Sequence, residues 1–147
     1  MAAVAAGFLA SALFIFLKTE RIKSSDMSRQ GIVLVSRRYG LSGKPDLILK
    51  KGLRYAPIEY KSYRCGGAAR EWDVAQLLAY CLLVEENLGN TDGGRLVYPD
   101  GEFFVRWNPE AKTYLMEIMA RMRAGRFEMT GDLGKCRNCE FSVYCRR

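Results

Sequence analysis

Three side chains in the first half of the chain have the types and the spacing that hydrolysis of a phosphodiester requires. Asp46 is followed, after twelve intervening residues, by Glu59, and Lys61 comes two positions later. Alternate residues of a strand face the same side, so Glu59 and Lys61 project together if this segment is extended. Carboxylate oxygens bind Mg²⁺ or Mn²⁺, and such a metal polarises a scissile phosphate and acidifies a water. The ammonium of Lys61 can hold or help deprotonate that water and offset the charge that builds on the phosphate.

A β-hairpin is the element that must bring these residues together. Residues 47–49 and 54–61 have the composition of two strands, and the Lys-Lys-Gly sequence at 50–52 is a turn signal. Folding about this turn places Asp46 opposite residues 57–59. The sequence therefore predicts two carboxylates and one ammonium at one spot, although a surface ladder of ion pairs on a hairpin has the same pattern.

A long helix after the hairpin offers two more candidate site residues. Two glycines break the chain, and residues 69–88 then have the pattern of one helix that Gly89 closes. Gln76 and Tyr80 lie four positions apart and share a face of this helix. We expect Gln76 to contact a substrate phosphate or the activated water, and Tyr80 to stack on or hydrogen-bond to nucleic acid. A buried Tyr80 with a satisfied hydroxyl is the alternative.

The remaining elements complete a small mixed sheet flanked by helices, an α/β (α+β) fold. Residues 31–35 are a β-branched run typical of a strand, and residues 95–98 and 102–107 form a second hairpin. Asn108 is the expected N-cap of a final helix, with Pro109 at its first position. That helix carries an apolar stripe that we expect in the core, namely Leu115, Ile118, Met119 and Met122.

The N-terminal residues have the composition of a membrane anchor. Residues 1–17 carry no charge, and as a helix they would span roughly 25 Å. The positive-inside rule keeps the bases that follow them in the cytoplasm. The sequence therefore predicts a single-pass transmembrane helix over residues 1–18, a linker over residues 19–30 and a cytoplasmic domain. A buried or mis-started N-terminal helix is the alternative.

Three of the five cysteines crowd into the C-terminal tail, residues 131–147. Cys136, Cys139 and Cys145 form a C-x2-C-x5-C pattern, which is typical of metal or iron–sulfur ligation and not of a disulfide framework. Three clustered thiolates and one distant thiolate are a common way to hold a 4Fe-4S cluster. The distant ligand is Cys81 or Cys65, and we favour Cys81. A zinc site with the same ligands, or no metal, is the alternative.

Charge and composition narrow the function classes further. The chain has no histidine, which excludes Ser-His and Cys-His catalytic pairs. From Lys18 to Arg64 the net charge is +8, and from Gly66 to the end it is −1. A basic surface around the candidate site suits a polyanion such as nucleic acid, whereas a solvated face beside a membrane segment is the other interpretation.

These motifs together resemble a known family. The segments GKPD ending at Asp46, EYK from Glu59 to Lys61 and QLLAY from Gln76 to Tyr80 resemble the RecB-like branch of the PD-(D/E)XK nucleases. With the cysteine tail, the chain looks like the CRISPR-associated RecB-type exonuclease family. The resemblance covers residues 40–147 and implies a restriction-endonuclease-like core, which we place at residues 31–130.

The resemblance implies a Mg²⁺- or Mn²⁺-dependent exonuclease that acts on single-stranded DNA ends, in CRISPR spacer acquisition or DNA repair. Asp46 and Glu59 would hold the metal with the backbone carbonyl of Tyr60, Lys61 would be the catalytic lysine, and Gln76 and Tyr80 would shape the site. The resemblance also implies that the clustered cysteines hold a 4Fe-4S cluster, for which Cys81 is our choice of fourth ligand beside Cys136, Cys139 and Cys145. The chain departs from the family in lacking a histidine and a cysteine upstream of Asp46.

Two other functions fit the same residues. A non-catalytic, membrane-tethered scaffold on a decayed nuclease fold would bind nucleic acid without cleaving it, and the absent histidine favours that hypothesis. A structure-specific or restriction-type endonuclease would cut a circular single strand, whereas an exonuclease needs an end.

Overall fold

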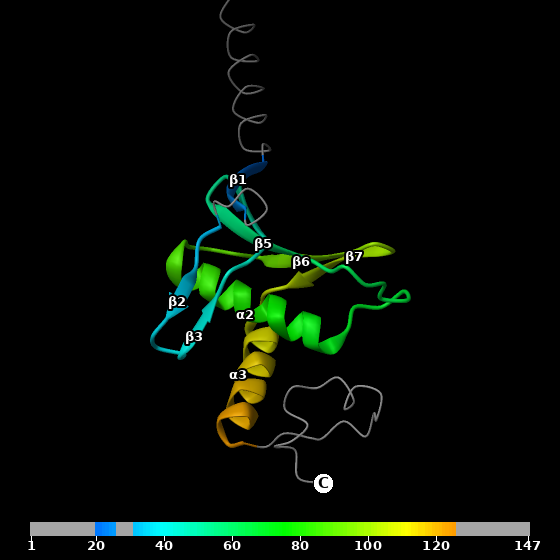
Figure 1. Ribbon diagram of the computed structural model, residues 1–147. Helices are drawn as coiled ribbons and strands as arrows, with labels where there is room; N and C mark the ends of the chain where they lie inside the picture. The colour runs from blue at the N-terminus through cyan, green and yellow to red at the C-terminus, as the bar shows by residue number, and fades with distance from the viewer. Residues whose placement is uncertain (1–19, 26–30, 126–147) are drawn as a thin grey trace, which may run out of the picture. The chain divides into compact units, whose positions relative to one another are not determined.

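The computed structural model describes residues 20–25 and 31–125, and their main element is a mixed five-stranded sheet (Figure 1). The strand order is β1-β4-β5-β6-β7, with β5 and β6 parallel and the other neighbours antiparallel. The strands are β1 (Glu20–Ser25), β4 (Leu47–Lys51), β5 (Arg54–Tyr60), β6 (Gly93–Tyr98) and β7 (Gly101–Arg106). The mixed α/β sheet expected from the sequence is therefore confirmed.

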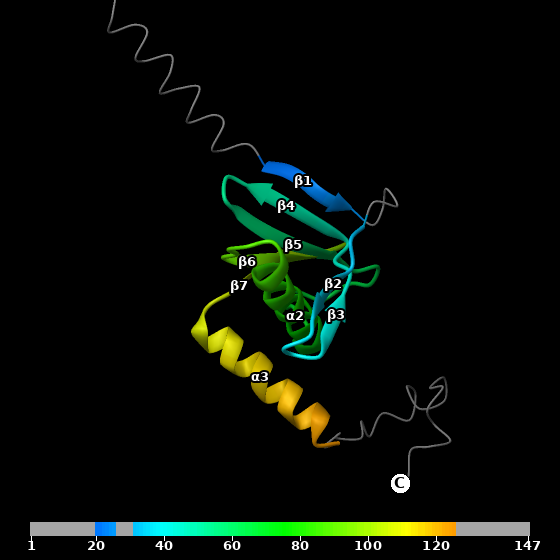
Figure 2. The same cartoon turned by 90° about the vertical axis from the view of Figure 1, so that its left-hand side faces the viewer.

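Helix α2 (Glu71–Asn87) makes the crossover between the parallel strands β5 and β6 and packs on both. A separate two-stranded hairpin, β2 (Leu34–Ser36) and β3 (Leu41–Gly43), packs against the same helix, as Figures 1 and 2 show. Because α2 is covered by two elements, it is apolar on more than one side. Leu77 packs with Leu96 of the sheet, whereas Leu83 belongs to the cluster that contains Leu34 of the small hairpin.

The two hairpins of the sheet follow the sequence expectation. In the first, Leu47 pairs with Ile58 and Lys51 pairs with Arg54, so the turn lies at Gly52 and Leu53. Gly52 has a φ of 58°, a left-handed conformation that glycine adopts without steric cost. In the second, Tyr98 pairs with Gly101. The first register places Asp46, the residue before β4, level with Glu59.

Helix α2 begins at Glu71, two residues later than the sequence pattern predicts. The reason is that Arg70 has an extended backbone, with φ −77° and ψ 141°, and Gly66 and Gly67 upstream of it both have positive φ. The prediction of Gly89 as the terminator is confirmed, since its N–H bonds to the carbonyl of Val84 and its φ is 127°.

Two predictions for the N-terminal part of the domain were wrong. Residues 19–30, expected as a linker, contain strand β1, which pairs antiparallel with β4. A polar segment is suited to this place because an edge strand needs backbone partners on one side only. Residues 31–35, expected as a strand, contribute only Leu34 and Val35 to β2. Leu34 pairs with Gly43, so continued pairing would set Val33 opposite Lys44 and Ile32 opposite Pro45, which has no N–H to donate.

Helix α3 (Pro109–Arg123) begins as predicted, because the Asn108 side-chain oxygen accepts a hydrogen bond from the N–H of Ala111 at 2.8 Å. Its apolar stripe is only partly in the core. Leu115 and Met119 are buried, but Met122 is 58% exposed, so the prediction was wrong for Met122. The stripe ends there because Met122 lies in the last turn of the helix, followed by Gly125 with φ 64°.

Candidate active site

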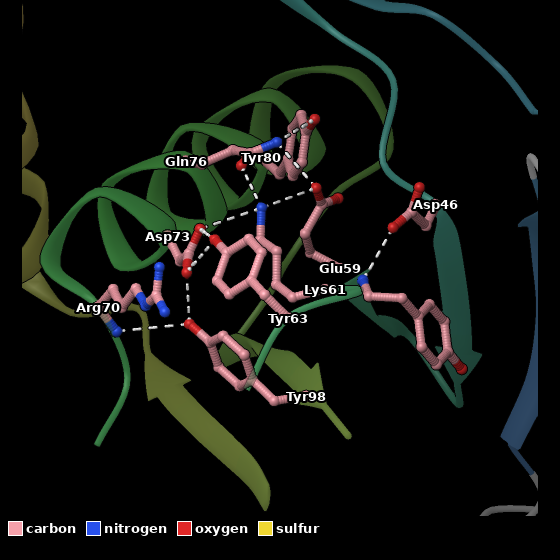
Figure 3. Close-up of polar contacts among 10 residues, drawn as sticks. Asp46, Glu59, Lys61, Tyr63, Arg70, Asp73, Gln76, Tyr80 and Tyr98 are labelled. Carbon is pink, nitrogen blue, oxygen red and sulfur yellow. Dashed lines mark hydrogen bonds and ion pairs between the residues drawn. The ribbon is translucent and has the colours of Figure 1, made fainter. Parts of the chain in front are cut away.

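The hairpin of β4 and β5 assembles the predicted carboxylates at its open end. The backbone N–H of Tyr60 donates to Oδ2 of Asp46 at 2.8 Å, which fixes the Asp46 carboxylate beside the end of β5 (Figure 3). Glu59 and Lys61 project to the same side, as the period of the strand requires. The N–H of Lys61 continues the pairing with β6 by donating to the carbonyl of Val97 at 2.8 Å. The structure therefore brings Asp46, Glu59 and Lys61 together.

The ammonium of Lys61 is held by three acceptors from two elements. Its Nζ lies 3.2 Å from Oε1 of Glu59, 2.6 Å from Oε1 of Gln76 and 3.2 Å from Oδ1 of Asp73 (Figure 3). Burial disfavours the charged amine, but the hydrogen bonds and charges of Asp73 and Glu59 outweigh it and raise the pKa of Lys61. Lys61 is therefore a fixed cation at neutral pH.

Gln76 connects the hairpin to helix α2. Its Oε1 accepts from Lys61, and its Nε2 donates to Oε1 of Glu59 at 2.8 Å and to the hydroxyl of Tyr80 at 3.0 Å. The expectation that Gln76 and Tyr80 share a face beside the hairpin is thus met. The Tyr80 hydroxyl is linked to Glu59 through Gln76, and its ring is half-buried against Gly43. Burial raises the pKa of the Tyr80 hydroxyl.

Glu59 has the environment of a carboxylate that is suited to bind a cation. Only 7% of the residue is exposed, and its Oε2 has no hydrogen-bond partner among the residues that the structure describes. Burial, and next the charge of Asp46, raise the pKa of the Glu59 carboxyl. A buried oxygen without a partner, close to a second carboxylate, fits a hard divalent cation such as Mg²⁺ or Mn²⁺.

The described residues supply few side-chain ligands at this place. Within residues 20–25 and 31–125, no group of three or more His, Cys, Asp or Glu side chains is arranged to hold a metal. Asp46 and Glu59 are two such side chains, and Tyr60 adds a backbone carbonyl at the end of β5. A cation at this site would therefore complete its coordination with water and substrate oxygens, as Mg²⁺ commonly does.

Asp73 is a site residue that the sequence reasoning missed. It is 1% exposed, and it accepts hydrogen bonds from Tyr63 at 2.6 and 2.7 Å and from Tyr98 at 2.6 Å in addition to its contact with Lys61. Burial raises the pKa of this carboxyl, but the bonds from Tyr63, Tyr98 and Lys61 outweigh it and lower the pKa overall. The signal in the sequence was its position three residues before Gln76, on the same helical face.

The loop between Lys61 and α2 is fastened to the β6–β7 turn. Both carboxylate oxygens of Asp100 accept backbone N–H groups, from Cys65 at 2.9 Å and from Gly66 at 3.0 Å. These bonds hold the pKa of Asp100 at about 2. The Cys65 thiol also contacts Asp100, at 3.3 Å. Cys65 thus helps to fix the loop that connects β5 to α2.

Most of the proposed iron–sulfur ligands and the membrane anchor lie outside the described residues. This holds for Cys136, Cys139 and Cys145 and for residues 1–18. Cys81 is described: it is fully buried in α2, and burial raises the pKa of its thiol to about 12. That environment supports the alternative of a small core residue, because iron binds the thiolate. In the described part of the chain, no helix is long and apolar enough to cross a bilayer.

Comparisons with known proteins agree with this geometry. The chain matches the PD-(D/E)XK nuclease superfamily over residues 4–146. It is 27% identical over 139 residues to the CRISPR-associated exonuclease Cas4/endonuclease Cas1 fusion of Geobacter sulfurreducens. The alignment covers 88% of this chain and 25% of that protein, so the chain spans about a quarter of its relative's length.

The crystal structure of SSO0001 shares the fold, with a TM-score of 0.53 and 20% sequence identity over 98% of this chain and 70% of that chain. The resemblance to CRISPR-associated RecB-type nucleases that the motifs indicated is confirmed by the family match and by the Geobacter protein. Since the match includes the hairpin of Asp46, Glu59 and Lys61 and nearly all of the chain, the protein belongs to the PD-(D/E)XK nuclease superfamily.

Proposed function

We propose that this chain is a Mg²⁺- or Mn²⁺-dependent exonuclease that hydrolyses single-stranded DNA from an end. The observation that carries the proposal is the partnerless Oε2 of Glu59, which is buried beside Asp46 and next to the cation of Lys61. Two carboxylates and one ammonium are the parts that cleavage of a phosphodiester needs, and Gln76 joins Glu59 to that ammonium. The basic charge of the segment from Lys18 to Arg64 supports a polyanionic substrate.

Asp46, Glu59 and the Tyr60 carbonyl would hold the metal. When bound, it supplies Lewis-acid activation of the scissile phosphate and of a water. Lys61 would lie beside the scissile phosphate. There the water oxygen bonds to phosphorus, the bond to the leaving nucleotide oxygen breaks, and the proton that the water loses passes through solvent to the leaving oxygen. Because its pKa is raised, Lys61 keeps its proton and offsets the negative charge that develops on the phosphate oxygens. Gln76 fixes Lys61 and Glu59 relative to each other.

The decisive experiment compares wild type with Glu59→Gln on end-labelled single-stranded DNA, with Mg²⁺ or Mn²⁺. The matched control is Glu102→Gln, because Glu102 is an exposed carboxylate on β7 whose partner is Arg95. We expect metal-dependent digestion by wild type and by the control, and a loss of about 100-fold or more in Glu59→Gln. A circular single strand should survive, whereas its cleavage would indicate an endonuclease.

Absence of digestion by folded wild-type protein under either metal would overturn the proposal. DNA binding without cleavage would then favour the non-catalytic scaffold on a decayed nuclease fold, which the absent histidine also suggests.

The cellular setting is proposed from sequence and similarity alone. We propose a role in CRISPR spacer acquisition or DNA repair, with residues 1–18 as a single-pass anchor and the domain in the cytoplasm. We propose that Cys136, Cys139 and Cys145 hold a 4Fe-4S cluster with a fourth thiolate, zinc being the alternative metal. Membrane fractionation of the full chain checks the anchor. Iron and sulfide analysis of anaerobically purified protein, against a Cys139→Ser variant, checks the cluster.

A further inference from the structure

A buried carboxylate lies directly behind the proposed catalytic lysine. Asp73 comes from the first turn of α2 and is almost completely excluded from solvent. Both of its oxygens are used: Oδ1 meets Lys61 and Tyr63, and Oδ2 meets Tyr63 and Tyr98. Substrate or metal has no access to an oxygen so enclosed, so Asp73 acts on the reaction only through its neighbours.

Two segments, the loop between β5 and α2 and the end of β6, build the enclosure around Asp73. Tyr63 lies in the loop after β5, Tyr98 ends β6, and Arg70 precedes α2. The guanidinium of Arg70 stacks on the ring of Tyr63 at 4.2 Å, and its backbone N–H donates to the hydroxyl of Tyr98 at 3.4 Å. The hydroxyls of Tyr63 and Tyr98 both point at the Asp73 carboxylate, and their hydrogen bonds hold it in place (Figure 3).

This arrangement is a costly way to stabilise a fold. An ion pair out of water usually contributes no more stability than well-packed apolar side chains of the same volume would. The neighbours of Asp73 along α2 show that apolar packing is available here, because Leu77 and Leu78 are buried on the same helix. The charge of Asp73 therefore needs an explanation beyond packing, and its one cationic contact among the described residues is Lys61.

Lys61 faces a competition between two carboxylates. Its Nζ lies 3.2 Å from Glu59 and 3.2 Å from Asp73, so the ammonium is shared equally between an acid in the site and an acid behind it. Without Asp73 the ammonium would pair with Glu59 alone, and Glu59 is the residue whose second oxygen would bind the metal. The ammonium donates a third hydrogen bond to Gln76, which lies on the same helix as Asp73.

We propose that Asp73, held by Tyr63 and Tyr98, is a positioning residue that keeps the Lys61 ammonium aligned with the scissile phosphate and limits its pairing with Glu59. This inference rests on the proposed nuclease function for its catalytic half. Its second half concerns metal binding at Glu59 and is measurable without DNA. Partners that orient metal ligands in this way typically contribute about 10- to 100-fold to activity or metal affinity.

The first test is kinetic, with Asp73→Asn against the control Asp92→Asn. Asp92 is an exposed carboxylate that pairs with Arg54, so Asp92→Asn removes the same charge from an ion pair outside the proposed site. We expect kcat to fall about 10- to 100-fold in Asp73→Asn, with KM for DNA within about twofold of wild type and no change in the control. Tyr63→Phe should give a smaller loss in the same direction, because Asp73 keeps Tyr98. Wild-type kcat per folded molecule in Asp73→Asn would overturn the proposal.

The second test measures Mn²⁺ affinity of DNA-free protein by electron paramagnetic resonance. Asp73→Asn should bind Mn²⁺ about tenfold more weakly. In a Lys61→Met background the same change at Asp73 should have no further effect, because Asp73 acts through the lysine. An equal loss in both backgrounds would show a direct charge effect and overturn the proposal. If wild type cleaves no DNA, the proposed function fails, and this cycle alone decides the role of Asp73.

Discussion

At the scale of single residues, Glu59 is subject to opposite requirements from folding and from the proposed metal binding. A metal ligand must be ionised and must have a free oxygen, and Glu59 has such an oxygen at Oε2. Folding instead favours the protonated form, because burial and the charge of Asp46 raise the pKa of the carboxyl above its ordinary value of 4.5. The ionised side chain therefore lowers the stability of the metal-free protein at neutral pH.

This conflict predicts that Glu59→Gln stabilises the protein while abolishing activity. The penalty on ionised Glu59 is absent below the unfolded pKa, grows as the pH rises through the folded pKa and is constant above it. Without metal at pH 7, the melting temperature of Glu59→Gln should exceed that of wild type by about 2–4 °C. The difference should shrink as the pH approaches 4.5 and reverse when Mn²⁺ is added, because only wild type binds it.

Thermal melts of both proteins between pH 4.5 and 8, with and without Mn²⁺, check this prediction. Glu102→Gln is the control, since Glu102 is half exposed and should leave the melting temperature unchanged at every pH. A Glu59→Gln protein that melts below wild type without metal would show that the bonds to Lys61 and Gln76 outweigh the charge penalty.

At the scale of elements, the close approach of β3 to α2 sets the place of the Tyr80 ring. Gly43 ends β3, and a Cβ at this position would lie 2.7 Å from Cε1 of Tyr80 and 3.2 Å from Cδ1 of Leu83. No carbon atom fits at such a distance without displacement of the ring. The hydroxyl of that ring accepts the hydrogen bond from Gln76, so the small hairpin reaches the site through this contact.

We predict that Gly43→Ala lowers the free energy of unfolding by about 1–3 kcal/mol and also reduces activity, because the displaced Tyr80 ring would release Gln76. Urea unfolding and the cleavage assay measure the two effects. Gly52→Ala is the comparison: Gly52 has φ 58° and open space around it, so alanine there strains only the turn. Loss of stability should be similar in the two variants, but Gly52→Ala should keep its activity. Equal activity in both would mean that Tyr80 does not position Gln76.

The hairpin of the candidate site could be predicted from the sequence because its signals are local. A hairpin turn and the alternation of side chains along a strand bring Asp46, Glu59 and Lys61 together. The helical repeat places Gln76 and Tyr80 on one face. Asp73 could not be assigned, because its partners Tyr63 and Tyr98 come from different elements that only tertiary packing brings together. Strand β1 was missed for a related reason: its polar sequence forms a strand only because β4 offers an unpaired edge.

At the scale of the whole molecule, β1 joins the sheet beside the strand that Asp46 precedes. Ser25 pairs with Leu47 and Glu20 pairs with Lys51, so β1 covers the full length of β4. We predict that a chain starting at residue 19 folds and keeps its activity, whereas one starting at residue 27 aggregates or melts at a lower temperature. Removal of β1 would expose the edge of β4, which can then pair with another chain.

Circular dichroism melts and size-exclusion chromatography compare the two truncated chains. Equal melting temperatures and monodisperse profiles would show that the sheet does not need β1. A lower melting temperature for the chain that starts at residue 27 would show that β1 is part of the folded domain.

The uneven charge of the chain predicts how binding of single-stranded DNA responds to salt. The segment from Lys18 to Arg64 has a net charge of +8 and contains the proposed site, whereas the rest from Gly66 onward is close to neutral. Bases that contact phosphates release counterions, so the logarithm of the affinity should fall linearly with the logarithm of salt concentration, by about 0.7 for each phosphate contacted. Lys44→Gln, two residues before Asp46, should reduce that slope by about 0.7, since one contact is lost.

The matched control is Lys112→Gln, because Lys112 lies in the near-neutral part of the chain and its ammonium pairs with Glu85 at 2.7 Å. Fluorescence anisotropy of a labelled oligonucleotide, with Ca²⁺ in place of the active metal, gives the slopes without cleavage. If Lys112→Gln reduces the slope more than Lys44→Gln does, the DNA path lies away from the proposed site. A lower salt dependence for Lys44→Gln than for Lys112→Gln would instead indicate that the DNA backbone runs along the basic segment. It would then reach the hairpin at Asp46 and Glu59, beside the Lys61 ammonium.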